Sequence, residues 1–131
     1  MAMDEKTFKD RTKKLALRVI RLIEALPKSR AADVIGKQLL RSACSVGANY
    51  RAACRGRSKA DVIAKLSLVE EEADESLYWM ELLVDGGVIS EEKMKNLMAE
   101  TREILAMTVA SIKTMRRKQS YLPIQNPKSK I

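Results

Sequence analysis

Residues 30–57 read RAADVIGKQLLRSACSVGANYRAACRGR, and this stretch decides the fold that we expect for the chain. It contains no proline, and at the roughly 100° per residue of an α-helix its apolar residues share one face. That face holds Ile35, Leu39, Ala43, Val46, Tyr50 and Ala53. The opposite face holds Arg30, Lys37, Arg41, Arg51 and Arg55, and Arg57 follows them. The stretch therefore predicts one long helix with a core-facing side and a basic side.

Helical spacing of apolar residues predicts three further helices. They run from about Thr7 to Leu26 with a cap at Thr7, from a Ser58 cap to about Asp85, and from a Ser90 cap to about Lys118. In the helix after Ser58 the expected inward residues are Val62, Leu66, Val69, Ala73, Leu77, Met80 and Val84. Because the connections are short, neighbouring helices should be antiparallel. The sequence predicts an all-α fold, an antiparallel up-down-up-down four-helix bundle.

The bundle is expected over residues 1–118, with residues 119–131 forming a basic C-terminal tail. The tail includes SYLPIQNPKSKI, which has two prolines and no helical period. A length of 131 residues suits a single domain with a core of its own.

Charge is distributed unevenly along the chain, whose net charge is +8. Residues 30–66 contain eight basic and two acidic residues, whereas residues 67–100 contain two basic and ten acidic ones. Such polarity is typical of a protein that binds a phosphate backbone, or of one whose copies contact each other through opposite charges.

Several classes of function are disfavoured by the residue types present. There is no histidine, and Cys44 and Cys54 lie about 15 Å apart along one predicted helix, which argues against a disulfide and against common zinc sites. We expect free, buried thiols, no metal and no cofactor. The carboxylates Glu71, Glu72, Asp74 and Glu75 lack the histidines of a di-metal bundle site. No nucleophile, base and orienting group can be assembled, so no enzymatic activity is expected.

A membrane protein is also disfavoured. No apolar run approaches the roughly 18 residues that a membrane-spanning helix needs, and the N-terminal residues are charged. The expected location is the cytoplasm.

Two blocks of the sequence resemble a known family. RSACSVGANYRAA and EADESLYWMELL stand in the order and separation found in 23S rRNA intervening-sequence proteins, which are four-helix bundles sometimes labelled ribosomal protein-like. The likeness covers residues from about 5 to 118. It implies a bacterial, generally non-enzymatic protein that assembles as a homopentamer. The accessory proteins of diversity-generating retroelements are similar in fold, and they are basic pentamers that bind a reverse transcriptase and nucleic acid.

The basic side of the helix over residues 30–55 is the candidate nucleic-acid site. Its members are Arg30, Lys37, Arg41, Arg51, Arg55 and Arg57. Arginine forks suit phosphate oxygens, and several such contacts supply affinity. The alternative is a solvated face, or ion pairs with acidic residues of the adjacent helix. Because no aromatic residues accompany the cations, recognition of shape and phosphate density is expected rather than base reading.

Other residues are expected to have structural roles. Asn49, with Arg41 or Arg51, is predicted to meet Glu72 or Glu75 across the contact between the second and third helices and so to set their register. The residues expected at a subunit interface are Leu17, Ile20, Tyr50 and Trp79, and the core is the alternative for Tyr50 and Trp79.

The leading functional hypothesis is a non-enzymatic homo-oligomer, pentameric by resemblance, that binds structured RNA or other nucleic acid through the basic helix face. The alternative is an interaction scaffold whose basic surface docks an acidic protein partner.

Overall fold

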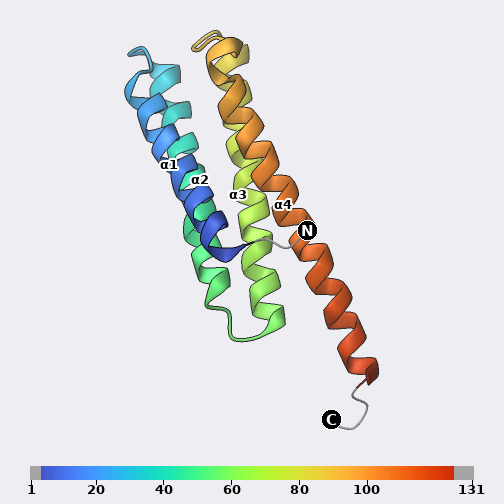
Figure 1. The fold of residues 1–131 in the computed structure, drawn as a ribbon. Helices are drawn as coiled ribbons and strands as arrows, with labels where there is room; N and C mark the ends of the chain where they lie inside the picture. The colour runs from blue at the N-terminus through green and yellow to red at the C-terminus, as the bar shows by residue number, and fades with distance from the viewer. Residues whose placement is uncertain (1–3, 126–131) are drawn as a thin grey trace.

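The computed structural model describes residues 4–125, and describes side chains over residues 4–118. The described residues form four helices and no strand: α1 (Glu5–Glu24), α2 (Arg30–Cys54), α3 (Lys59–Asp85) and α4 (Glu91–Gln125). Successive helices run in opposite directions, each beside the previous one (Figure 1). The predicted antiparallel four-helix bundle is confirmed.

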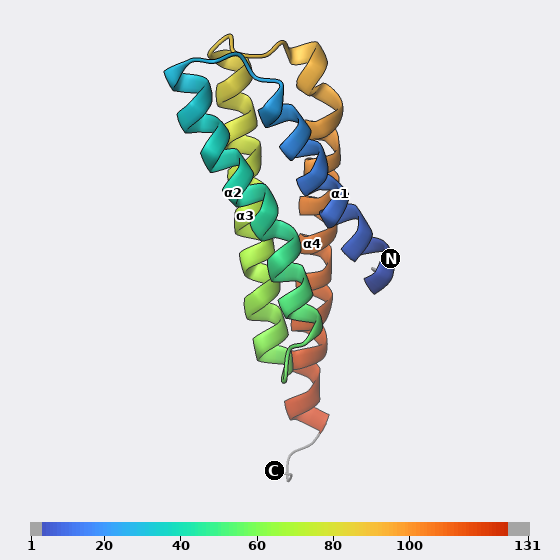
Figure 2. The same cartoon turned by 90° about the vertical axis from the view of Figure 1, so that its left-hand side faces the viewer.

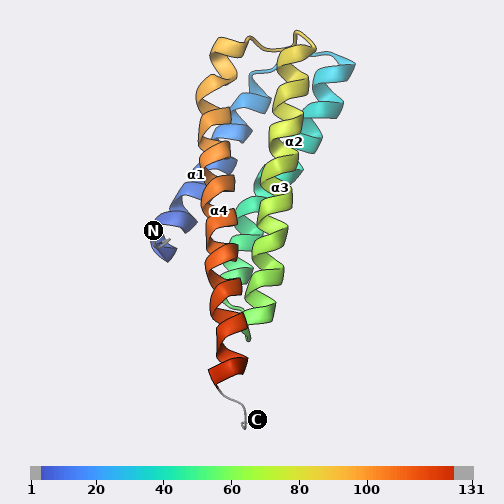
Figure 3. The same ribbon diagram turned by 90° about the vertical axis from the view of Figure 1, so that its right-hand side faces the viewer.

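The four helices form two layers. Figures 2 and 3 view the molecule from opposite sides, with α1 and α2 nearest the viewer in the first and α3 and α4 nearest in the second. The contact between α2 and α3 is the most extensive, and that between α1 and α4 is the smallest. None of the helices, over the described part of the chain, is long and apolar enough to cross a membrane.

Short polar side chains begin the helices. The hydroxyls of Ser29 and Ser58 accept hydrogen bonds from the backbone N–H groups of Ala32 and Asp61, each at 3.1 Å. Both caps satisfy an N–H group that has no partner inside the helix. The predicted cap of the first helix at Thr7 is wrong: Asp4 is the cap, and its carboxylate accepts from the Thr7 N–H at 3.0 Å.

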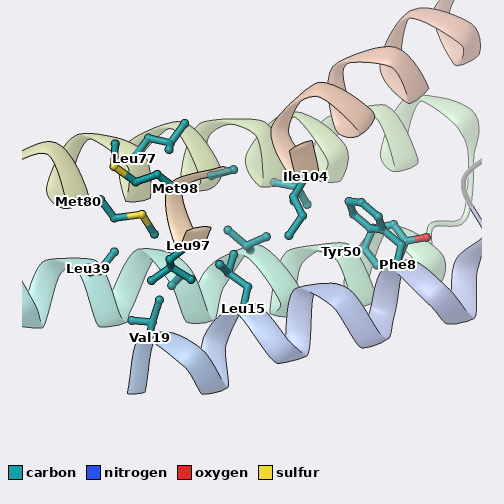
Figure 4. Packing of buried hydrophobic residues seen from close by; sticks show 14 of the residues in the cluster. Phe8, Leu15, Val19, Leu39, Tyr50, Leu77, Met80, Leu97, Met98 and Ile104 are labelled. Carbon is teal, nitrogen blue, oxygen red and sulfur yellow. The ribbon is translucent and has the colours of Figure 1, made fainter. Parts of the chain in front are cut away.

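The core is aliphatic along most of its length and aromatic near the start of α1 (Figure 4). Most of the expected inward residues are buried, but at the ends of α3 the buried residues are Ile63 and Leu83 rather than Val62 and Val84. Val62 instead packs beneath the α2–α3 loop, where it leaves no room for a side chain on Gly56. The Val62 side chain is therefore covered by the α2–α3 loop and not by a neighbouring helix.

Helix α4 extends past the end expected at Lys118 and stops at Gln125. The first proline of the predicted tail, Pro123, lies in the last turn of the helix. Residues 119–125 of the predicted tail are thus helical, and residues 126–131 lie outside the described residues.

Two buried serines join α2 to α3. The Oγ atoms of Ser42 and Ser76 are 2.8 Å apart, and both residues are 0% exposed. Each hydroxyl also lies within reach of a carbonyl of its own helix, Leu39 O at 3.2 Å and Glu72 O at 2.9 Å. This pair sets Ser42 opposite Ser76 and so defines the register between the two helices.

Candidate nucleic-acid interface

All six predicted phosphate-binding residues, Arg30, Lys37, Arg41, Arg51, Arg55 and Arg57, are exposed. They do not form one surface, because α2 is long. From Arg30 to Arg55 the helix rises about 37 Å, so the two ends of the basic side lie at opposite ends of the bundle. The structure therefore divides the candidate site into four environments.

The middle of the basic side is occupied by ion pairs. Arg41 Nη1 donates to Glu72 Oε1 of α3 at 3.3 Å, and Arg41 Nη2 donates to Glu75. The Trp79 indole N–H donates to the same Glu75 carboxylate at 3.0 Å. These two donors, the indole first, lower the pKa of Glu75. Glu75 in turn raises the pKa of Arg41. Arg41 is thus engaged within the chain.

Asn49 does not take part in this contact, contrary to the prediction. Its Nδ2 donates to the Ser45 carbonyl at 2.9 Å, within α2. Because Ser42 is opposite Ser76 and the helices are antiparallel, Asn49 lies beside the part of α3 that precedes Glu72. The helix register thus carries Asn49 past both carboxylates.

At the start of α2, the basic residues stand among other charges. Lys37 Nζ lies 3.6 Å from the Asp33 carboxylate, one turn earlier. Arg30 and Lys37 border an open hollow with Lys28 and Glu24, beside the α1–α2 loop. Exposed i,i+4 pairs of this kind contribute little to stability. This end of the bundle mixes both signs of charge.

Arg51 faces α1 instead of the outer side of α2. With Lys9, Lys13 and other residues it lines a hollow of about 430 Å³ between the two helices, hereafter the α1–α2 groove. The remaining lining residues are Asp10, Thr12, Ala16, Cys44, Gly47 and Ala48. Cys44 is exposed there, so the expectation that both thiols are buried was wrong. The two cysteines are free, as expected.

The end of α2 lies at the same end of the bundle as cations from a distant part of the chain. The α2–α3 loop and the last turns of α4 lie at the same end of the bundle, and α4 projects past the loop (Figure 1). The exposed cations at this end form what we call the loop-end surface: Arg55, Arg57, Lys113, Arg116, Arg117 and Lys118. Within residues 4–118, none of these six side chains is in an ion pair.

The α4 members of this surface were missed as binding residues from the sequence. Basic residues near a helix C-terminus are adequately explained by the helix dipole, and three of these four adjoin the predicted helix end. The excess of basic residues in the last segment of the chain was the available signal. It could not show that these residues lie at the same end of the bundle as the α2–α3 loop.

The four residues predicted at a subunit interface differ in their exposure to solvent. Leu17 and Ile20 are exposed, at 40% and 41%, on the outer side of α1. Trp79 is half-buried. Tyr50 is 6% exposed and packs edge-on against Phe8, with ring centroids 4.6 Å apart, so it belongs to the core of the single chain. Burial raises the pKa of its phenol.

The comparisons with known proteins agree with the fold. A family model described as 23S rRNA-intervening sequence protein matches residues 5–110. A crystal structure of a protein of unknown function from the S23 ribosomal protein family of Bacteroides thetaiotaomicron is 35% identical, with a TM-score of 0.79. The match covers 85% of this chain and 99% of that one. No curated protein matches the sequence.

Proposed function

Because this chain belongs to the 23S rRNA-intervening sequence protein family, we propose that it binds structured RNA through its loop-end surface, as a homo-oligomer and without catalysing a reaction. The six cations of that surface carry the proposal. They come from the α2–α3 loop, which begins at Arg55, and from α4, and they are exposed and unpaired within residues 4–118. An unpaired arginine can use its whole fork on a phosphate, because it gives up no internal partner.

The composition of the surface favours phosphates over bases. Its members within residues 4–118 are arginines and lysines, and the aromatic pair Tyr78 and Trp79 lies on α3, near the other end of the bundle. Without an aromatic platform, unpaired bases have nothing to stack on. A folded RNA, with dense phosphates and a fixed shape, is the ligand that this arrangement suits best.

Binding of this kind is steeply dependent on salt. Each phosphate contact releases condensed counterions, so the logarithm of the affinity falls with the logarithm of the salt concentration by about 0.7 to 0.9 per contact. Changing Arg55 and Arg57 to glutamate should therefore weaken RNA binding by tenfold or more and reduce the slope by about 1.5. Arg41 is kept, because its reversal would break the ion pairs with α3.

The experiment titrates a fluorescent hairpin from 23S rRNA and a random RNA duplex at several salt concentrations. The matched control changes Arg30 and Lys37 to glutamate, which alters the net charge equally at the other end of the bundle. We expect the control to bind nearly as the wild type does. Absence of binding at low salt, or equal losses in the two variants, would refute the loop-end surface as the RNA site.

Assembly is the second part of the proposal. A homopentamer is the expectation from the family resemblance, and light scattering measures it directly against the 14.7 kDa of one chain. In a closed ring each copy would present its loop-end surface on the same side, so that several phosphate sites could act together.

A further inference from the structure

The α1–α2 groove has the features of a docking site for a helix. Its floor is made of small residues, Ala16, Gly47 and Ala48, and the two helices approach so closely that a Cβ on Gly47 would lie 3.3 Å from Thr12 Oγ1. Lys13 and Arg51 stand on its two walls. Both are exposed, and neither is in an ion pair within residues 4–118. Lys9 and the anion Asp10 also line the groove, which thus offers apolar contact flanked by three cations and one anion.

A matching surface exists on the same chain. Glu71, Asp74, Tyr78 and Glu81 are exposed and follow one another at intervals of three or four residues, so they form a single stripe along the outside of α3. We call this stripe the α3 ridge. Tyr78 is its apolar centre and is 52% exposed. Tyrosine is enriched at the centres of protein interfaces, where charged residues form the surroundings.

The outward Tyr78 ring contacts a partly buried neighbour that is itself held by a hydrogen bond. The ring packs edge-on against Trp79, with centroids 5.1 Å apart. The Trp79 indole is fixed in turn by its hydrogen bond to Glu75, which also pairs with Arg41 of α2. An anchor that is already ordered loses little conformational entropy on docking. The ion pair between Arg41 of α2 and Glu75 of α3 therefore also helps to position Tyr78, through Trp79.

The groove and the ridge share no residue and belong to different layers of the bundle. The groove lies between α1 and α2, which face the viewer in Figure 2, and the ridge lies on α3, in the layer that faces the viewer in Figure 3. A contact between two such different surfaces is heterologous, and in a pair of copies it leaves one groove and one ridge unused. The arrangement is satisfied only by a ring of three or more copies or by an open chain.

We infer that the α1–α2 groove of one copy receives the α3 ridge of the next, with Tyr78 over Ala48 and the acids of the ridge beside Lys13 and Arg51. The choice of a second copy as occupant rests on charge: the segment that contains the ridge has ten acidic and two basic residues, and the groove lies between two basic helices. The inference rests on the homo-oligomer proposed above and identifies its interface. It does not depend on RNA binding.

The test blocks one surface at a time. Ala48→Glu places a larger, negatively charged side chain in the groove. Tyr78→Glu removes the aromatic centre of the ridge and adds one more negative charge beside its acidic residues. Both positions are exposed, so folding should persist, as circular dichroism will check. Each variant alone is expected to be a single chain of 14.7 kDa by light scattering, at concentrations where the wild type is assembled. Asp74→Lys replaces the ridge variant if Tyr78→Glu does not fold.

Mixing the two variants gives the sharpest result. The intact ridge of Ala48→Glu fits the intact groove of Tyr78→Glu, while the two altered surfaces repel each other through their added glutamates. The mixture should therefore form dimers of one chain of each kind and nothing larger. The matched control is Ala110→Glu on the exposed side of α4, which should keep the wild-type mass.

Cys44 reports directly on the groove, because it is an exposed lining residue. With Cys54 changed to serine, alkylation of Cys44 by N-ethylmaleimide should be about tenfold slower in the assembled protein than in Ala48→Glu. A wild-type chain that is monomeric would overturn both this inference and the proposed homo-oligomer. An assembled wild type whose mass and Cys44 reactivity are the same in both variants would overturn this interface alone. A wild type that stops at a homodimer, or a mixture that assembles beyond dimers, would overturn the heterologous arrangement.

Discussion

The buried hydroxyl pair between α2 and α3 makes a quantitative prediction about stability. Ser42 and Ser76 have two protons between them and three short contacts, namely each other, Leu39 O and Glu72 O. If either serine becomes alanine, the remaining hydroxyl can still donate to the carbonyl of its own helix. Neither single substitution leaves a buried donor without a partner, so each loses only the bond between the helices.

The expected cost follows from that count. One buried neutral hydrogen bond contributes about 1 kcal/mol, and alanine returns a few tenths of this through its higher helix propensity. The double variant has neither hydroxyl and loses both donated bonds, so its cost should be about 2 kcal/mol before the same propensity gain, close to the sum of the two single variants. For a chain of this length, a loss of 1 kcal/mol corresponds to a decrease in Tm of roughly 4 °C.

Urea unfolding followed by far-UV circular dichroism measures all four members of the cycle. The protein concentration must be held constant, because assembly would shift the midpoint. A control cycle pairs Ser76→Ala with Thr108→Ala, whose hydroxyl donates only to Ile104 O of its own helix at 2.8 Å. That cycle should be additive within about 0.5 kcal/mol. Single variants with the wild-type urea midpoint, or a double variant no less stable than either single one, would refute the bond between the helices, provided that the m value is unchanged.

Three further predictions concern other contacts. Arg11 donates to both Glu100 oxygens, at 3.0 and 2.9 Å, and its side chain is 24% exposed. Arg11→Lys should therefore destabilise the protein by about 1–2 kcal/mol, and it should speed amide exchange first in α1, because the contact between α1 and α4 is the smallest. Equal exchange rates in all helices would contradict this prediction. The pKa of Glu75 is lowered in the folded state, so its ionised carboxylate stabilises the protein at a pH above the ordinary pKa of 4.5, and this stabilisation is lost as the pH falls through the folded-state pKa. The urea midpoint of the wild type should exceed that of Glu75→Gln at pH 7, and the difference should vanish in acid. A difference that does not change with pH would argue against the ionised contact. Gly56→Ala would place a Cβ 3.2 Å from the Val62 backbone nitrogen and against the Val62 side chain. We therefore expect the free energy of unfolding to fall by about 1–3 kcal/mol in the same urea assay. An unchanged midpoint would show that the loop moves to accommodate the methyl group and would contradict this prediction.

Much of the fold could be predicted from the spacing of apolar residues. Leu39, Ala43 and Val46 are fully buried, as their positions on one face of a helix indicate. Helix ends were less predictable, because they depend on local competition: Asp4 caps α1 in place of Thr7, and α4 passes Lys118. Where the tertiary structure adds a loop over the helix, as at Val62, the inward face also departs from the simple period.

The candidate site was predicted less completely. Exposure of the six cations on and after α2 agrees with their spacing, but their environments differ according to what each meets on another helix. Arg41 meets two carboxylates of α3, Arg51 faces the groove beside α1, and Arg55 shares an end with the cations of α4. Partners of this kind are separated by tens of residues in the sequence, and helical spacing alone does not select among Arg41, Arg51 and Asn49 as the residue that meets the α3 carboxylates.

The sequence by itself determined the number of helices, their order, their buried faces and the polarity of charge along the chain. These properties depend on residues within a few turns of each other, whose relative positions the helix geometry dictates. Only the tertiary structure decided the register between helices, set at Ser42 and Ser76, and the length of α4 that projects beyond the bundle. Register shifts of one turn preserve every apolar face but change every polar partner, so the exclusion of Asn49 from the contact with Glu72 and Glu75 follows from packing alone.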